Sequence, residues 1–256
     1  MTRDHVTINR DVWDADAPNW VAPGERLWQA GSPEWGNWGC PEASLNMLPQ
    51  DMHGLDAIEL GCGTAYVSGW MARRGADVTA IDVSPAQLAT ARRLADYHDA
   101  DIRFIEGNAE ATGLPDNAFD FAISEYGAAI WCPPALWLRE AWRLLRPGGR
   151  LVFLGNHPLV LLCSPENGAP CDPILHRPYR NLWGADWTEV EFEPSGVCFN
   201  LTMSGWVALF SEIGFTILNY QEIFIPDWAT GTRAAIPADW GKDYPIEQVW
   251  HLEVRK

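Results

Sequence analysis

The stretch Ala57-Ile58-Glu59-Leu60-Gly61-Cys62-Gly63-Thr64-Ala65, together with Asp82 at the end of the next apolar run, decides the fold of this chain. Residues 55–60 are few and mostly apolar, which is typical of a strand buried on both faces of a parallel sheet. The two glycines after this strand let the chain turn sharply and leave its main chain open to a close ligand. The stretch therefore predicts a strand followed by a ligand-binding turn.

A helix and a second strand are predicted after the turn. Residues 64–74 show a helical pattern, and the free amides at the start of such a helix would point toward a ligand at the turn. Residues 77–81 predict the second strand, and Asp82 stands at its carboxyl end. A carboxylate in that place can accept two hydrogen bonds from the vicinal hydroxyls of a ribose. The whole order predicts a βαβ unit that binds a nucleoside.

Two side chains argue against a dinucleotide at this turn. The dinucleotide fingerprint has a third glycine three residues after the second, and that position is Tyr66. Glu59 lies two residues before the first glycine, where it would repel a diphosphate. S-adenosylmethionine suits an acid there better, because it carries an ammonium group and a sulfonium but no phosphate. A nicotinamide-dependent dehydrogenase, which would bind a dinucleotide at this turn, is therefore only the alternative hypothesis.

The motif resembles that of the class I S-adenosylmethionine-dependent methyltransferases. Their first motif is an acid followed by alternating glycines, and Ala65 stands where the family often has a third glycine. The resemblance implies S-adenosylmethionine as cofactor and a doubly wound, seven-stranded, mostly parallel sheet whose last strand is antiparallel. It also implies that the side chain of Asn108 meets the adenine amino group. The expected cofactor-binding residues are Glu59, Gly61, Cys62, Gly63, Thr64, Asp82, Val83, Gln87, Asn108, Ala109, Glu110 and Ser124.

Strands and helices alternate over residues 51–155, the predicted cofactor-binding half. Ser84 and Pro85 begin a predicted helix that runs to about residue 97. Further strands are predicted at 102–106, 119–123 and 150–154, with a helix from 133 to 145 and a turn at 146–149 before the last of them. This alternation indicates a parallel sheet with helices on both faces.

Three further segments complete what we expect to be one compact domain. Residues 1–50 hold Trp13, Trp20, Trp28, Trp35 and Trp38, and predict short helical pieces and turns that form a lid over the pocket. Residues 156–200 show no period, which favours an insertion after the fifth strand that caps the substrate side. Residues 201–256 predict a closing helix at 203–213 and two strands, at 215–223 and 249–254.

Composition narrows the classes of partner. The chain has 256 residues and a net charge of −16, so a nucleic-acid backbone would be repelled. Its six cysteines form no Cys-x-x-Cys pair, which favours reduced thiols and argues against a zinc site or any other metal. No signal peptide is visible, and no apolar run reaches the roughly 18 residues that span a bilayer. We expect a cytoplasmic protein with no membrane partner, and its oligomeric state stays open.

The expected chemistry is an in-line displacement of a methyl group, which depends mainly on positioning and the exclusion of water. A general base is needed only if the acceptor carries a proton of high pKa. The catalytic candidates are His157, Glu125 and Tyr126, which follow predicted strands at their ligand-facing ends. The expected acceptor is a small organic molecule, methylated on oxygen, nitrogen or carbon. A non-catalytic protein that binds S-adenosylmethionine is a further alternative.

Overall fold

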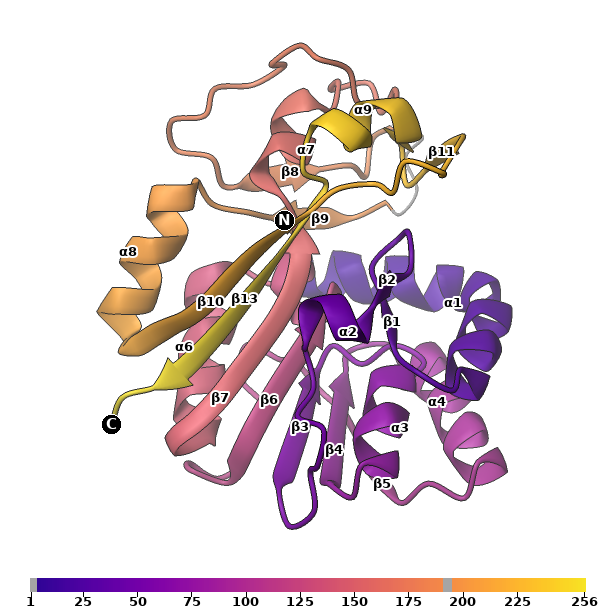
Figure 1. The fold of residues 1–256 in the computed structure, drawn as a ribbon, viewed down its shortest axis with the longest axis vertical. Coiled ribbons are helices and arrows are strands. Elements are labelled where there is room, and N and C mark those ends of the chain that lie inside the picture. The colour runs from indigo at the N-terminus through magenta and orange to yellow at the C-terminus, as the bar shows by residue number, and fades with distance from the viewer. Residues whose placement is uncertain (1–3, 191–194) are drawn as a thin grey trace.

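The computed structural model describes residues 4–190 and 195–256, and a seven-stranded sheet lies at its centre (Figure 1). The strands follow the order β10 (Phe215–Ile223), β13 (Glu247–Val254), β7 (Leu145–Asn156), β6 (Phe119–Glu125), β3 (Asp56–Leu60), β4 (Asp77–Asp82) and β5 (Ile102–Glu106). Only β13 within this sheet of the described chain runs antiparallel to its neighbours, β10 and β7. The prediction of a doubly wound, mostly parallel sheet with an antiparallel last strand is confirmed.

Alternate residues of each strand serve two separate cores, one on each face of the sheet. Ile58 and Leu60 of β3 pack with α6 (Pro134–Leu144) and α8 (Met203–Ile213). Ala57 points to the other face, where α3 (Tyr66–Arg73) packs and α4 (Pro85–Tyr97) lies beside it. This two-residue period on a strand buried from both sides explains why the run is almost wholly apolar.

The prediction of short helical pieces at the N-terminus is wrong. Residues His5–Gln29 form one helix of 25 residues, α1, which Asp4 caps by accepting a hydrogen bond from the Thr7 amide. Pro18 and Pro23 lie inside it, and prolines usually break a helix. Packing overrides that preference, because Trp28 is buried against α3 and its indole nitrogen donates to the Thr64 carbonyl at 2.8 Å.

The rest of the predicted lid is short and regular. Strands β1 (Glu34–Trp35) and β2 (Cys40–Pro41) form a hairpin that is followed by α2 (Glu42–Leu45). Residues 1–3 of the lid lie outside the described part of the chain.

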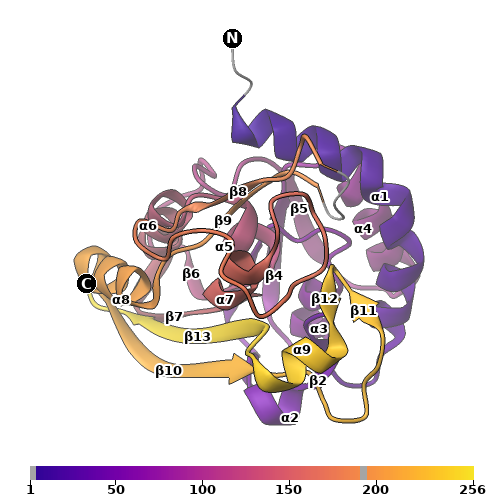
Figure 2. The same cartoon turned by 90° about the horizontal axis from the view of Figure 1, so that it is seen from above.

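The insertion after β7 contains regular structure that its sequence did not reveal. It begins with α7 (Pro158–Cys163) and ends with a hairpin of β8 (Gly184–Asp186) and β9 (Val197–Phe199). Residues 191–194 of this segment lie outside the described residues. Seen from above, the insertion lies beside a second excursion made of β11 (Thr232–Arg233), β12 (Ile236–Pro237) and α9 (Ala238–Asp243) (Figure 2).

Two features near β6 and β7 differ from the expected pattern of strands and helices. Strand β7 begins at Leu145 and includes the predicted turn at 146–149, where its register with β6 is irregular. A short helix, α5 (Gly127–Trp131), follows β6 directly.

None of the helices in the described ranges has the length and apolar character needed to cross a membrane.

Gly214→Ala is expected to lower the free energy of unfolding by about 1–2 kcal/mol, since an L-residue pays that much in the left-handed region. Gly214 ends α8 with a φ of 106°, and an added Cβ would lie 3.2 Å from the Trp142 indole nitrogen. Gly31→Ala is the control, because that glycine has open space around its Cβ position. Urea denaturation measures the free energy of unfolding of both variants. Equal stability of the two would contradict the strain expected for an L-residue at position 214.

Candidate active site

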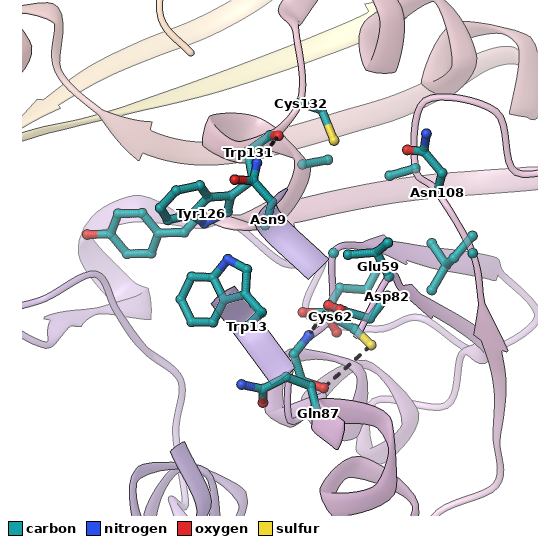
Figure 3. A pocket seen from close by; sticks show the side chains of 18 of the residues that line it. Asn9, Trp13, Glu59, Cys62, Asp82, Gln87, Asn108, Tyr126, Trp131 and Cys132 are labelled. Carbon is teal, nitrogen blue, oxygen red and sulfur yellow. Dashed lines mark hydrogen bonds between the residues drawn. The ribbon is translucent and has the colours of Figure 1, made fainter. Parts of the chain in front are cut away.

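A pocket lies at the carboxyl ends of β3, β4, β5 and β6, and α1 covers one side of it (Figures 1 and 3). It encloses about 940 Å³ that protein atoms do not fill, its open mouth included, which suits a ligand of drug or cofactor size. The predicted cofactor residues that line it are Glu59, Gly61, Cys62, Gly63, Thr64, Asp82, Val83, Gln87, Asn108, Ala109 and Glu110. None of the described residues that line the pocket is a lysine, arginine or histidine.

The glycine turn after β3 has the geometry that its sequence predicts. Gly61 has a φ of 77° and Gly63 a φ of 52°, both in the left-handed region. A Cβ on Gly61 would lie 2.6 Å from the Ala128 amide nitrogen, so only glycine lets α5 approach the turn this closely. The amides of Gly61 and Cys62 both donate to the carbonyl of Ile81, which ties the turn to β4.

Asp82 faces the pocket from the end of β4 and also holds the turn. Its Oδ2 accepts from the Gly63 amide at 2.7 Å, and its Oδ1 accepts from the Ser84 amide at 2.9 Å. Burial raises the pKa of this carboxyl, while the backbone hydrogen bonds act in the opposite direction. Each carboxylate oxygen can accept a second hydrogen bond, so Asp82 keeps acceptor capacity toward the pocket.

Glu59 is buried at the end of the pocket near α3. The amide and hydroxyl of Ser68 both donate to its Oε2. Burial, the largest effect, raises the pKa of Glu59 to about 8. A cation bound next to this carboxyl would favour its charged form and lower that pKa again.

The loop after β5 supplies another wall. Asn108 Oδ1 accepts from the Glu110 amide at 2.9 Å, which forms a local turn and leaves the amide group at the pocket edge (Figure 3). Glu110 contacts α1, because its Oε1 lies 2.6 Å from His5 Nε2. Across the pocket, Gln87 is buried and its Oε1 has no hydrogen-bond partner within the described chain. An unsatisfied buried oxygen of this kind is a ready acceptor for a ligand donor.

Glu125 and Tyr126 line the pocket on the side of β6, as their place after the strand suggested. Glu125 Oε1 accepts from the Gly36 amide at 2.9 Å, and its Oε2 accepts from the Tyr66 hydroxyl. Burial is the largest effect on Glu125 and raises its pKa. Tyr126 has a φ of 56°, and its hydroxyl donates to Glu247 at the side of the ring turned away from Asp82 (Figure 3).

Two predicted site residues are not brought to this pocket. Ser124 is wholly buried beneath it, where its hydroxyl donates to the Leu60 carbonyl at 2.7 Å and accepts from the Ala129 amide. His157 caps α7, and its Nδ1 accepts from the Leu159 amide at 3.2 Å. His157 Nε2 lies 3.3 Å from Glu222 Oε1, outside the pocket, and burial lowers the pKa of the imidazole.

Residues 58–153 match the family described as "Methyltransferase domain". This segment runs from β3 to β7 and covers less than half of the chain. Over this segment, the match supports the predicted resemblance to the class I S-adenosylmethionine-dependent methyltransferases. This methyltransferase domain contains the glycine turn, Asp82, Asn108 and the end of β6, which are the parts that build the pocket floor.

The curated relatives match mainly this domain. The chain is 40% identical over 115 residues to malonyl-[acyl-carrier protein] O-methyltransferase of Pectobacterium atrosepticum, covering 44% of this chain and 42% of that protein. It is 37% identical over 103 residues to demethylmenaquinone methyltransferase of Thermus thermophilus, covering 40% and 47%. The matched stretch thus spans less than half the length of either relative.

Solved structures share the fold over most of the chain. An S-adenosylmethionine-dependent methyltransferase from Mesorhizobium loti superposes with a TM-score of 0.61 at 24% identity, covering 82% of this chain and 95% of that one. The [4+2]-cyclase SpnF superposes with a TM-score of 0.62 at 20% identity, covering 97% and 96%. At such identities the likeness concerns the fold.

The pocket of the methyltransferase domain has walls that sequence reasoning missed. Tyr66 and Cys132 belong to the domain itself, whereas Val6 and Asn9 come from α1. Trp13 and Trp20 of α1, which belong to the tryptophan-rich segment, also line it, as does Trp131 of α5. The density of tryptophan was a usable signal, whereas nothing in the sequence near Asn9 marks it.

Asn9 joins three elements at the pocket mouth. Its amide group donates to the carbonyls of Trp131 and Val197, at 3.0 and 2.9 Å, and its Oδ1 accepts from the Val197 amide at 2.8 Å. The side chain is 3% exposed, so these bonds form away from water. Asn9 therefore holds the first half of α1 against α5 and β9.

Asn9→Ala is expected to loosen the first half of α1, because it removes three buried hydrogen bonds worth on the order of 1 kcal/mol each. Amide hydrogen exchange at residues 5–14 should become at least about tenfold faster, while exchange in β3 and β4 should not change. Asn19→Ala is the matched control, since Asn19 lies exposed on the same helix and its side chain donates to Asp16 of that helix. Equal protection of α1 in both variants would contradict the role given to Asn9.

Proposed function

We propose that this protein is an S-adenosylmethionine-dependent methyltransferase that acts on a small organic acceptor. The observation that carries the proposal is one pocket in which bare main chain at Gly61 and Gly63 lies between two acids, the buried Glu59 and the half-buried Asp82. A pocket lined by acids, with no basic side chain among its described residues, favours a ligand of positive charge and disfavours phosphates.

The residues present fit the parts of this cofactor. Asp82 has two acceptor positions for the ribose hydroxyls, as proposed from its place after β4. Val83, Asn108 and Ala109 form the wall beside it, where the adenine ring would lie. Glu59 lies at the other end, where its charge would attract the ammonium group of the methionine part. The ring of Tyr126 and the indole of Trp131 would offer aromatic faces to the sulfonium.

Glu125 is the residue that we propose as general base. When bound, S-adenosylmethionine supplies an electrophilic methyl group on its sulfonium. A raised pKa makes the Glu125 carboxylate a better proton acceptor near neutral pH than an exposed glutamate. Tyr66 and the Gly36 amide hold this carboxylate by hydrogen bonds, so it would receive the proton of a hydroxyl or amine acceptor in a fixed position. His157 is no longer a candidate for direct contact with substrate, because it lies outside the pocket.

The relatives suggest acceptor classes, and the pocket separates them. The names of the two curated relatives given above specify a malonyl thioester and a demethylated menaquinone. A malonyl group carries a carboxylate, which the acids of this pocket would repel. A neutral acceptor such as a quinol fits better.

The predicted cytoplasmic location is part of this proposal, because the six cysteines are free thiols.

A second function receives support from one comparison. The [4+2]-cyclase SpnF has the same fold and is not named as a methyltransferase, so the fold also serves other chemistry. This keeps the non-catalytic alternative in view. The dehydrogenase alternative loses support at two pocket residues. Tyr66 lies where a dinucleotide site would need a glycine, and Glu59 lies where it would need an uncharged wall.

Calorimetric titration of the purified protein tests the proposal. S-adenosylmethionine and S-adenosylhomocysteine should each bind, with a dissociation constant in the micromolar range typical of substrates, and NADH should give no heat of binding. Binding of NADH without binding of either sulfur compound would overturn the proposal. Binding of the cofactor with no labelled methyl transferred to any of a broad set of phenols, amines and quinols would favour the non-catalytic alternative.

A further inference from the structure

A second pocket adjoins the cofactor pocket at Trp131, which lines both. It encloses about 580 Å³ that protein atoms do not fill, including its mouth. Its walls come from α5, from both ends of the insertion and from the turn between β11 and β12 (Figure 2). The residues that matter most for its chemistry are Ile130, Trp131, Leu161, Trp187, Phe199 and Ile236.

Trp131 is shared by the two pockets. It lines both of them, and its neighbours continue the two walls, since Cys132 lines the first pocket and Ile130 the second. The indole of Trp131 packs edge-on against Trp13, with ring centroids 5.3 Å apart. Asn9 donates to the Trp131 carbonyl, which fixes the backbone where the two pockets adjoin. The two pockets thus adjoin at Trp131.

The second pocket presents apolar surface. Ser164 uses its hydroxyl to donate to the Val160 carbonyl at 2.7 Å. Asn200 donates to the Asn156 carbonyl at 2.9 Å and accepts from the Trp206 indole at 3.1 Å. No acidic or basic side chain is found among the described residues that line it, and burial raises the pKa of the Cys198 thiol. The side chains of Ser164 and Asn200 are thus already bonded within the protein.

We propose that the second pocket binds the body of the methyl acceptor, and that this acceptor is an uncharged, largely apolar ring compound. The inference rests on the proposed function, because it treats the first pocket as the cofactor site. A charged group buried among these side chains would lose its water without gaining a partner, which costs several kcal/mol. Aromatic walls at Trp131, Trp187 and Phe199 favour a flat ring that can stack on them. The reactive atom of such an acceptor would pass Trp131 to reach the methyl group.

Three naphthalene compounds probe this pocket in protein saturated with S-adenosylhomocysteine. 2-Naphthol is uncharged, 6-hydroxy-2-naphthoate adds a carboxylate, and 2-naphthylmethylamine adds a cation. We expect 2-naphthol to bind at least about tenfold more tightly than either charged compound, by calorimetry or by quenching of tryptophan fluorescence. Equal or tighter binding of a charged compound would overturn the inference about the class of acceptor.

A filled-pocket variant tests the location. Ala234 is exposed and lines the mouth of the second pocket, so Ala234→Trp should block it and weaken 2-naphthol binding at least about tenfold. Ala235→Trp is the matched control, because Ala235 is its neighbour in the same turn, also has a positive φ and does not line the pocket. Both variants should keep the affinity for S-adenosylhomocysteine. Unchanged naphthol binding in Ala234→Trp overturns the inference, whereas failure of wild-type protein to bind S-adenosylhomocysteine overturns the proposed function instead.

Discussion

Asp82→Ala is expected to weaken the binding of S-adenosylmethionine by roughly one to two orders of magnitude, because it removes a pair of charge-assisted hydrogen bonds to the ribose. The carboxylate faces the pocket from the end of β4. Among the described residues of the pocket, it is the only acid that ends the strand after the glycine turn, which is where a nucleoside-binding unit places its ribose-binding acid. Calorimetry with S-adenosylmethionine and with adenosine alone measures the effect. Both ligands should lose affinity by a similar factor, since both carry the same ribose.

Two further variants separate binding from folding. Asp82 also accepts from the amides of Gly63 and Ser84, so its removal could disturb the turn. Asp82→Asn keeps one acceptor oxygen and should weaken binding less than Asp82→Ala does. Asp77→Ala is the control, because Asp77 is exposed at the opposite end of the same strand. An unchanged affinity in Asp82→Ala, with a normal melting temperature, would refute the ribose assignment.

Much of the fold could be predicted because its inner strands are buried on both faces. Strands β3, β4, β6 and β7 were predicted as short, mostly apolar runs of this kind. The outer strands β5 and β10 hold exposed residues and do not follow that pattern. Helix α1 could not be found in this way. Its sequence contains Pro18 and Pro23, and it is held by contacts such as that between Trp28 and Thr64, which are distant in the chain. Local propensity carries no information about such contacts.

The site could be predicted where the backbone itself positions the residue. The glycine turn, Asp82 and Asn108 lie at strand ends, and strand ends at one edge of a parallel sheet converge on the ligand. Ser124 shows the limit of this reasoning, because it also ends a strand but its side chain points under the turn. His157 shows another limit, since the chain after β7 turns into α7 and carries the imidazole away toward Glu222.

The buried acid on β13 could not be predicted to matter at all. Glu247 has no exposed surface, and its Oε1 accepts from the Asn37 amide at 2.8 Å and from the Tyr126 hydroxyl. Its Oε2 has no hydrogen-bond partner in the described chain. Burial is the largest effect on this carboxyl and raises its pKa to about 7, from 4.5 for the free group. Glu247 thus connects the β1–β2 hairpin to Tyr126 at the pocket wall.

Glu247 should make the folded protein less stable as pH rises. The folded state binds the Glu247 proton more tightly than the unfolded state does, so its contribution is fully present below the unfolded pKa of 4.5 and is lost as pH rises through about 7. Integrated over that interval, the loss amounts to about 3 kcal/mol in the free energy of unfolding. Glu247→Gln, which resembles the protonated side chain and cannot ionise, should remove this component.

Urea denaturation at pH 5 and pH 7.5 measures the difference between the two proteins. Relative to wild type, Glu247→Gln should gain about 2 kcal/mol of stability between these pH values, because the other acids titrate in both proteins and cancel in the comparison. Glu253→Gln is the matched control on the same strand, since Glu253 is partly exposed beside Arg150 and lies away from the pocket. Curves that stay parallel for wild type and Glu247→Gln would show that Glu247 ionises as readily in the folded protein as in the unfolded chain.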